Sequence, residues 1–342
     1  MSELINIWLG NAEKTIFAGE ALAKTLYAIP VDILLSGELG AGKTTLLQGF
    51  AKGLGVRQRM VSPTFALEQR YRTDNAGCEV RNAELIHIDL YRLSEIQSRQ
   101  LLFSTDNHEG IRCIEWPEHA GIDFDVPKIH VQLHEKGEGR TVTIAFDDIA
   151  LPTREEIDDW RKEMLLPEHI GRHCDAVADF SKELGAMLLG RGIPLRPMLL
   201  RRSAEVHDLL RFLDFRPGGF AGAESHSDEQ LRLWVDMRKR YPGLKHEPAC
   251  AEFLREHGYP AVAEVVKVHG LTLPSPPRRT IEQQILFYAD KRVKVDERVT
   301  LDERFSDFRA RYSDGKRSED GETWYREATG VQRDLFPEGC PI

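Results

Sequence analysis

The sequence lacks several features that would place it in a common class of proteins. No apolar run approaches the 18 residues that a membrane-spanning helix needs, and no internal repeat is visible along the 342 residues. The N-terminal segment carries no positively charged region before its apolar residues, so we expect no secretory signal. These absences predict a protein of the cytoplasm that works without a membrane.

A cysteine framework and an excess of basic residues are also missing. The five cysteines are scattered, odd in number and without a CxxC pair, which favours reduced thiols. The 46 basic and 55 acidic residues give a net charge of −9, a poor basis for a stand-alone nucleic-acid clamp because phosphate binding needs a basic surface. With 41% hydrophobic and 30% charged residues, the composition is that of a globular protein, and the length predicts two domains.

The periodicity of the chain divides it into an α/β half and a helical half. In residues 1–150, short apolar runs predict buried strands, and the alternating segments 129–133 and 142–146 predict a hairpin. Residues 151–313 show successive amphipathic helices, which predicts a second, all-α domain. Residues 314–342 begin with a segment too polar to pack, so we expect a mobile tail there.

A glycine-rich segment in the first half fits the phosphate-binding pattern G-x-x-x-x-G-K-[ST]. Its glycines let backbone N–H groups point inward, and the following helix places its positive end under the same phosphates. In this pattern Lys43 reaches the β- and γ-phosphates, and the Thr44 hydroxyl ligates Mg²⁺. The sequence therefore predicts Mg-ATP binding by Gly37, Glu38, Leu39, Gly40, Ala41, Gly42, Lys43, Thr44 and Thr45.

Two carboxylates stand at the ends of predicted strands and are candidates for the same site. Asp89 follows the strand at 85–88 and is the better candidate to hold Mg²⁺, although it could instead cap a helix. Glu115 ends the strand at 111–115 and could order the metal shell or orient the attacking water. A salt bridge at the strand end is the alternative for Glu115.

Four motifs in this order resemble the TsaE family, the ATPase of bacterial threonylcarbamoyladenosine (t6A) tRNA modification. They are SGELGAGKTTLLQGFAKGLG, VSPTF from residue 61, HIDLYR from residue 87 and IEWP from residue 114. The resemblance covers about residues 10–147 and implies a P-loop NTPase fold with a central sheet. It also implies ATP hydrolysis in a complex with TsaD and TsaB-like proteins, and contact with tRNA through that complex.

The TsaE resemblance also assigns roles to single residues. It implies that Lys43 and Glu115 are catalytic, and that Thr44, Asp89 and Glu115 hold the Mg²⁺ of ATP. Thr64, in the VSPTF motif, would lie in a switch-like loop near the γ-phosphate. Thr15 would lie near the nucleotide.

In the second half, histidine and aspartate residues are spaced as the ligands of one metal ion. His173, the pair His207-Asp208 and the distant Asp290 lie on different predicted helices that can converge. Nitrogen and oxygen ligands with open positions suit Mn²⁺, Fe or Zn²⁺. Such an ion lowers the pKa of a bound water and makes a nucleophile for a phosphate ester.

This second pattern resembles the HD-domain metal-dependent phosphohydrolases, from about residue 166 to residue 308, and its closing segment is YADKRVKVDERVTLDERF. The resemblance implies His173, His207, Asp208 and Asp290 as metal ligands, with Asp208 also catalytic.

The same resemblance implies that His246 and His269 hold a second ion, so that the domain would bind one or two ions. It places Arg211 near the substrate phosphate. His246 could instead only begin a helix, and His269 could only favour a helix dipole.

The combined prediction is an ATPase of t6A modification fused to a phosphohydrolase that acts on a phosphate ester, of which a nucleotide is the favoured kind. Two alternatives remain open from the sequence. The first is a P-loop kinase for a small molecule with a counteracting HD phosphatase. The second is an ATPase whose HD module does not catalyse but senses nucleotide or docks a partner.

Overall fold

The computed structural model describes residues 3–63, 66–74, 83–215, 226–312 and 318–340. Its contacts divide the chain into two compact units. Unit 1 comprises residues 1–149 with the short segments 185–196 and 279–281, and unit 2 comprises the remainder. Among the described residues, no helix is both long and apolar enough to cross a membrane.

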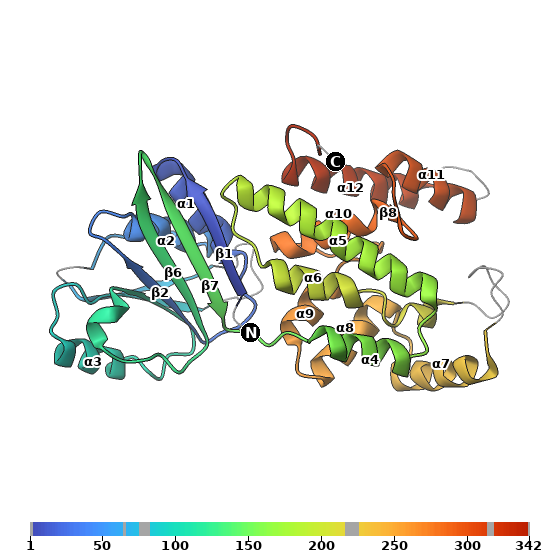
Figure 1. The fold of residues 1–342 in the computed structure, drawn as a ribbon, viewed down its shortest axis with the longest axis horizontal. Coiled ribbons are helices and arrows are strands. Elements are labelled where there is room, and N and C mark those ends of the chain that lie inside the picture. Colours follow the sequence, from blue (N-terminus) through green and yellow to red (C-terminus); the bar gives the residue numbers. More distant parts are fainter. Residues whose placement is uncertain (1–2, 64–65, 75–82, 216–225, 313–317, 341–342) are drawn as a thin grey trace. The chain divides into compact units, whose positions relative to one another are not determined.

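Unit 1 is built on one mixed sheet of seven strands in the order β1-β7-β6-β2-β5-β4-β3 (Figure 1). The four central strands β6, β2, β5 and β4 are parallel to one another. At one side of them β7 pairs antiparallel with β6 and β1 pairs antiparallel with β7, and at the other side β3 pairs antiparallel with β4. The expected hairpin is confirmed as β6–β7. The strands are β1 (Glu3–Leu9), β2 (Val31–Gly37), β3 (Glu68–Arg72), β4 (Glu84–Asp89), β5 (Ile111–Glu115), β6 (Lys128–Lys136) and β7 (Gly139–Asp147).

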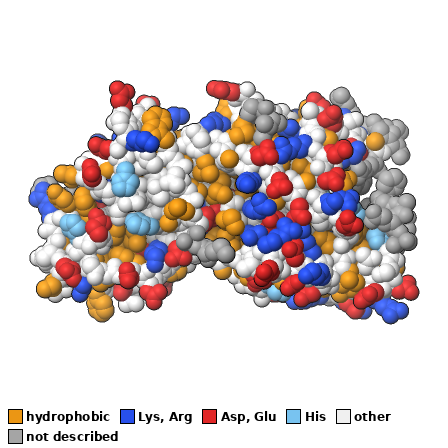
Figure 2. Space-filling model, in the orientation of Figure 1, with side chains coloured by type: hydrophobic (Ala, Val, Ile, Leu, Met, Phe, Trp, Pro, Cys, Tyr) orange, Lys and Arg blue, Asp and Glu red, His pale blue; other side chains and the backbone are white. Residues whose placement is uncertain are grey.

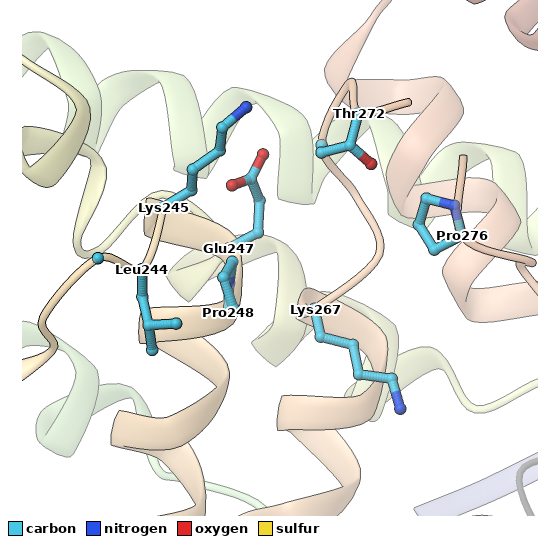
Figure 3. Close-up of a pocket in the computed structure, with 9 residues that line it drawn as sticks. Leu244, Lys245, Glu247, Pro248, Lys267, Thr272 and Pro276 are labelled. Atoms are coloured by element: carbon cyan, nitrogen blue, oxygen red, sulfur yellow. The ribbon is translucent and has the colours of Figure 1, made fainter. Parts of the chain in front are cut away.

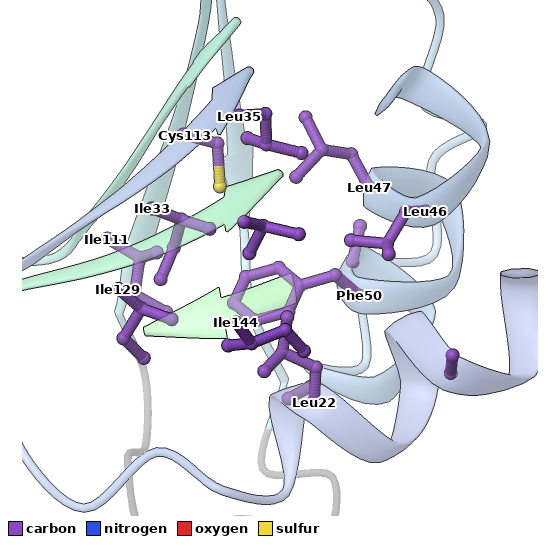
Figure 4. Packing of buried hydrophobic residues seen from close by; sticks show 14 of the residues in the cluster. Leu22, Ile33, Leu35, Leu46, Leu47, Phe50, Ile111, Cys113, Ile129 and Ile144 are labelled. Carbon is purple, nitrogen blue, oxygen red and sulfur yellow. The ribbon is translucent and has the colours of Figure 1, made fainter. Parts of the chain in front are cut away.

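Helices cover both faces of this sheet. On one face, α1 (Ala12–Ala23) and α2 (Lys43–Gly53) bury Leu22 and Phe50 against the strands (Figure 4). On the other face, α3 (Glu95–Ser104) and the short helix η1 (Pro117–Ala120) contribute Leu102 and Ala120 to a smaller apolar cluster. Because both faces are covered, β2, β4 and β5 are buried along most of their length, as their short apolar runs predicted, whereas β6 alternates between buried and exposed residues.

The contact between α1 and α2 depends on glycine. A Cβ at Gly49 would lie 1.9 Å from the Ile16 carbonyl oxygen, and one at Gly19 would lie 2.1 Å from the Leu46 carbonyl oxygen. Both distances are far below a van der Waals contact with backbone, so only glycine permits this approach. The close packing fixes α2, whose first turn carries Lys43 and Thr44.

Unit 2 is largely helical, with one small departure from the all-α expectation. A two-stranded hairpin, β8 (Val293–Lys294) and β9 (Glu297–Arg298), follows α10. The helices are α4 (Arg154–Glu163), α5 (Glu168–Gly190), α6 (Pro197–Val206), η2 (Arg211–Asp214), α7 (Asp228–Arg240), α8 (His246–Glu256), α9 (Pro260–Val266), α10 (Ile281–Asp290), α11 (Leu301–Tyr312) and α12 (Glu319–Leu335).

The C-terminal segment differs from the mobile tail expected for residues 314–342. Residues Glu319–Leu335 form the helix α12, which begins at a Ser318 side-chain cap. The Glu327 carboxylate attaches α12 to the segment before α10. It accepts a hydrogen bond from the Ser275 hydroxyl at 2.9 Å and forms an ion pair with the buried Arg278 at 2.5 Å. The polar composition therefore misled the prediction, because the residues that hold the helix are more than 40 positions away.

The charged side chains of unit 2 are mixed in sign on the face that Figure 2 shows. Arg154 and Arg161 each lie 2.9 Å from Asp175, and Arg154 also pairs with Glu205 at 3.3 Å. These arginines are therefore neutralised within the unit, in keeping with the net acidic composition.

Candidate functional site

The glycine-rich segment forms a loop between β2 and α2, as the pattern requires. Gly40 and Gly42 take positive φ angles of 88° and 100°, which side chains rarely adopt. Gly42 is the N-cap of α2, and the helix begins at Lys43. The loop therefore presents backbone N–H groups and a helix N-terminus at the carboxyl ends of the parallel strands, which is the geometry of an anion site.

Lys43 is buried in this loop and bonded to the loop's own backbone. Its Nζ donates to the carbonyl oxygens of Gly37 at 2.7 Å and Glu38 at 3.0 Å. The same ammonium lies 3.8 Å from the centroid of the Trp116 ring. Burial lowers the pKa of Lys43, although nearby carboxylates oppose this change.

The two predicted carboxylates are adjacent in the sheet. Asp89 ends β4 and Glu115 ends β5, and the two residues are paired in the parallel register. Both are buried, at 4% and 3% exposure. Glu115 Oε1 accepts from the Thr44 hydroxyl at 2.9 Å. The two carboxylates and this hydroxyl are oxygen donors, the ligands that Mg²⁺ prefers, so the residues present fit the ion.

The alternatives for these carboxylates are wrong. Ser94, and not Asp89, is the N-cap of α3, and Asp89 Oδ1 instead accepts from the Tyr91 N–H at 3.0 Å in a turn. Glu115 is buried and bonded to Thr44, so it does not form a salt bridge on the surface.

Two residues around the loop were given no role by the sequence. His87 is fully buried, and its Nε2 lies 2.9 Å from Glu115 Oε1, so it positions that carboxylate. Arg140, at the start of β7, donates to the Ala41 carbonyl at 3.0 Å. In the sequence, only the place of His87 in the HIDLYR motif pointed to a role for that residue. Nothing in the sequence pointed to Arg140, because Ala41, which accepts its hydrogen bond, lies 99 residues earlier.

The other predicted nucleotide contacts remain predictions. Thr15 is buried in α1, where its hydroxyl donates to the Asn11 carbonyl at 3.0 Å. Thr45 lies in the first turn of α2, and Leu39 is 71% exposed on the loop. Thr64 lies outside the described residues.

In unit 2, the six predicted metal ligands meet in one place. They come from α5, the turn after α6, the first residue of α8, the segment after α9 and the last residue of α10. The residues are His173, His207, Asp208, His246, His269 and Asp290, and the five besides Asp208 are at most 8% exposed. His246 thus begins a helix and also belongs to the cluster.

The His207-Asp208 pair lies just outside the helix on which the sequence placed it. The helix α6 ends at Val206, and the pair occupies the turn that follows. His207 Nδ1 bonds to the Ala204 carbonyl at 2.8 Å. In a continuing helix this carbonyl would accept from a backbone N–H of the next turn, so the imidazole replaces that bond where the helix ends.

The histidine rings are oriented by hydrogen bonds on the side away from the cluster. Nδ1 of His173, His207 and His269 bonds to the backbone carbonyls of Val295, Ala204 and Val266, at 2.9, 2.8 and 2.7 Å. A ring that donates from Nδ1 has its lone pair on Nε2, the tautomer of most metal-bound histidines. The three Nε2 atoms therefore face the carboxylates as ligands.

Each carboxylate lies close to two of the histidines. Asp290 Oδ1 lies 3.0 Å from His173 Nε2 and 3.7 Å from His207 Nε2. Asp208 Oδ1 lies 3.0 Å from His246 Nε2 and 3.5 Å from His269 Nε2.

The ligand atoms are close enough together to share ions. His173, His207 and Asp208 have ligand atoms within 4.8 Å of one another, and so do Asp208, His246 and His269. Asp208 belongs to both groups, which is the arrangement expected of a carboxylate that bridges two ions.

The buried polar atoms fit bound cations. His207 Nε2 is buried without a hydrogen-bond partner, which is costly unless a ligand engages it. Burial would raise the pKa of Asp208, but His207, Arg211 and His246 outweigh it and hold the pKa well below the usual aspartate range. Burial lowers the pKa of His269, which keeps its imidazole neutral. Burial would lower the pKa of His207 and His246, but neighbouring groups that include Asp208 outweigh it and raise the pKa of both. Ionised carboxylates and neutral imidazoles are the forms that bind metal, so a cation would displace a proton from these two rings.

Asp214, which the sequence analysis did not single out, supports the second group. Its Oδ2 lies 2.6 Å from His246 Nδ1, and its Oδ1 accepts from the His246 N–H at 3.2 Å. A carboxylate behind a metal-bound histidine is a common supporting partner. Arg211 Nη1 lies 3.0 and 3.1 Å from the two ring nitrogens of His246, so its role toward a substrate phosphate remains a prediction.

Comparison with known proteins finds relatives that match parts of this chain. The TsaE proteins of Nostoc and Bacillus subtilis are 42% and 36% identical over 123 and 132 residues. These matches cover 34% and 38% of this chain and 71% and 75% of the relatives. A Clostridium acetobutylicum structure, described as a predicted HD superfamily hydrolase involved in NAD metabolism, is similar at 16% identity and a TM-score of 0.31, over 56% of this chain and 93% of that one.

The interpretation of unit 2 rests on its own side chains. For unit 1, the family model described as threonylcarbamoyl adenosine biosynthesis protein TsaE matches residues 9–142, which span the phosphate loop and both carboxylates. Through these residues the chain belongs to the TsaE family.

Proposed function

We propose that unit 1 hydrolyses Mg-ATP in the cytoplasm as part of t6A modification of tRNA. The observation that carries this proposal is the Thr44–Glu115 bond of 2.9 Å beneath the phosphate loop, with Asp89 beside Glu115 in the sheet. These three residues would hold Mg²⁺, which when bound neutralises charge on the phosphates. TsaD and TsaB-like proteins are the proposed partners, and tRNA would be reached through them.

Each residue of the loop has a definite task in this proposal. The backbone N–H groups bind the phosphate oxygens, and Lys43 exchanges the Gly37 and Glu38 carbonyls for the β- and γ-phosphates. His87 keeps Glu115 in place. Catalysis would come from positioning and electrostatics, since phosphoryl transfer to water needs little covalent chemistry from the protein.

Binding of ATP to a Lys43→Ala variant tests this proposal. The matched control is Lys52→Ala, an exposed lysine of the same helix that pairs with Glu20. We expect Lys43→Ala to weaken ATP binding at least tenfold in calorimetry, since hydrogen bonds to charged groups contribute about 1.5–3 kcal/mol, and the control to bind normally. Unchanged affinity would contradict the site. ATP consumption that required an added small acceptor would indicate a kinase instead.

We also propose that unit 2 is a metal-dependent phosphohydrolase with two ions and a nucleotide substrate. The buried, unpartnered Nε2 of His207, in one of the two ligand groups that share Asp208, carries this proposal. His173, His207 and Asp290 would hold one ion, His246 and His269 the other, and Asp208 would bridge them. When bound, Mn²⁺, Fe or Zn²⁺ supplies a Lewis acid and an activated water for a phosphate ester.

Elemental analysis together with a hydrolysis panel tests the second proposal. Asp208→Ala should lose both bound metal and hydrolysis of p-nitrophenyl phosphate and nucleotides. The control Asp179→Ala removes an exposed carboxylate of α5 that pairs with Arg201, and it should retain both. Metal binding without turnover of any phosphate ester would instead favour a sensor or docking module.

A further inference from the structure

His269, one of the six predicted metal ligands, lies in a segment that forms no helix or strand. Residues 267–280 make up this segment, which joins α9 to α10. Lys267, Thr272 and Pro276 help to line a pocket of about 240 Å³ beside it (Figure 3). Because the backbone of the segment belongs to no helix or sheet, its buried carbonyl oxygens depend on side-chain donors.

The side chain of Arg278 holds the backbone on both sides of His269. Its Nε donates to the Val268 carbonyl at 2.9 Å, and its Nη2 donates to the Gly270 carbonyl at 3.1 Å. The side chain is 4% exposed, and its Cζ lies 3.5 Å from the centroid of the Phe287 ring. Among the described contacts, this cation has no bond to either carboxylate of the metal-ligand cluster.

Lys291 is a second buried cation, and it bonds to a carboxylate ligand. It is 3% exposed and directly follows Asp290, the last residue of α10. Its Nζ donates to the His269 carbonyl oxygen at 3.0 Å and to Asp290 Oδ2. A buried ammonium is costly unless it is paired, and these two acceptors pair it. The ammonium thus joins a ligand of one proposed ion to the backbone of a ligand of the other.

The two oxygens of Asp290 therefore have different partners. Oδ1 lies 3.0 Å from His173 Nε2 and 3.7 Å from His207 Nε2, so it faces two proposed ligands of one ion. Oδ2 accepts from Lys291 Nζ. A carboxylate that has one oxygen on a buried ammonium keeps the other oxygen for a metal ion.

We propose that Lys291 is a positioning residue that makes Asp290 bind its ion through Oδ1 alone. The ion is the one assigned above to His173, His207 and Asp290. The proposal rests on the metal-dependent function proposed for unit 2 and adds to it a residue that holds a ligand in place. A ligand that binds through one oxygen leaves a coordination position for the water that metal-assisted hydrolysis needs.

The direction of the change in metal affinity separates this role from a purely electrostatic one. The charge of Lys291 repels a cation, so removing the charge would tighten metal binding if nothing else changed. In Lys291→Met, however, the buried Asp290 Oδ2 loses its donor, and the carboxylate is free to turn. Loss of a supporting partner of a metal ligand costs about 10- to 100-fold in metal affinity, and we expect this loss to prevail.

The experiment titrates the chelator-treated full chain with Mn²⁺ in calorimetry, for the wild type, Lys291→Met, Arg278→Met and the control Lys239→Met. Lys239 is 72% exposed on α7. Lys291→Met should bind the ion beside Asp290 about 10- to 100-fold more weakly, and the control should bind it normally. Arg278→Met removes a buried cation of the same region that does not touch Asp290, so it should bind this ion as the wild type does. Anomalous peaks identify which ion is affected.

Two further measurements report how Asp290 binds. In crystals of the wild-type full chain with Mn²⁺, Asp290 should bind the ion through Oδ1 while Oδ2 stays on Lys291. The visible absorption of bound Co²⁺ should change in Lys291→Met, because a released carboxylate can add its second oxygen to the ion, and should stay unchanged in Lys239→Met.

The proposal would be overturned by a wild-type crystal in which both oxygens of Asp290 bind the ion. It would also be overturned by unchanged or tighter binding in Lys291→Met, by an unchanged Co²⁺ spectrum in that variant, or by equal weakening in Arg278→Met. The wild-type crystal decides the question if Lys291→Met does not fold. Failure of the metal-dependent function would differ, since the wild type itself would then hold no metal.

Discussion

Asp214 gives a direct way to separate the two proposed ions. Its carboxylate bonds to both Nδ1 and the backbone N–H of His246, at 2.6 and 3.2 Å. In Asp214→Asn the neutral amide keeps an acceptor oxygen but no longer supports the imidazole with a negative charge. The group that contains His173 and Asp290 has no bond to Asp214 among the described contacts, so the variant perturbs one ion only.

The expected size of the effect follows from the exposure of Asp214. Loss of a supporting partner of a metal ligand costs about 10- to 100-fold in metal affinity, or roughly 1.4–2.7 kcal/mol. The Asp214 side chain is 27% exposed, so solvent screens its charge and favours the lower end. We therefore expect one ion of unchanged affinity and one bound about tenfold more weakly.

Calorimetric titration of the chelator-treated full chain with Mn²⁺ measures both affinities, and elemental analysis after desalting counts the ions retained. The control is Asp236→Asn on α7, which is exposed and pairs only with Lys239 among the described contacts. Equal weakening of both ions, or no change in either, would refute the assignment of His246 to a separate second ion.

Three further predictions concern unit 1. Gly49→Ala places a Cβ 1.9 Å from the backbone of α1 and should destabilise the unit by about 1–3 kcal/mol in denaturant unfolding, whereas wild-type stability would show that the helices can separate. Arg140→Ala should weaken ATP binding about tenfold in calorimetry, because the Ala41 carbonyl loses a charged donor; normal affinity would make that bond dispensable. Burial would raise the pKa of Asp32, but His108 and Arg112 outweigh it and lower the pKa below 3.8. The ionised Asp32 therefore contributes to the free energy of unfolding above its unfolded pKa, and this contribution is lost as the pH falls. Asp32→Asn should lower the free energy of unfolding by about 3–5 kcal/mol at pH 7 and by progressively less below pH 4. A loss of stability that does not depend on pH would contradict this reasoning.

The parts of the fold that the sequence predicted are those coded by neighbouring residues. The phosphate loop needs only closely spaced glycines with Lys43 and Thr44, and the β6–β7 hairpin shows alternation on both sides of a turn. The edge strands β1 and β3 were not predicted, because a strand at the edge is held by one neighbour and needs no continuous apolar run.

The supporting residues of the sites depend on contacts between distant segments. Asp214 reaches His246 across 32 residues, and Arg140 reaches Ala41 across 99, so no local spacing connects either pair. The predicted metal ligands could be picked out from the sequence because histidine and the His-Asp pair are chemically distinctive. Their supporting carboxylates look like any surface acid until the fold brings them together.

The central claim is that six side chains of unit 2 hold two divalent ions. Anomalous diffraction from crystals of the full chain grown with Mn²⁺ tests it most directly. The account predicts two peaks on either side of Asp208, one between His173 and Asp290 and the other between His246 and His269. A map with no peak at these side chains, or with a single peak away from Asp208, would contradict it.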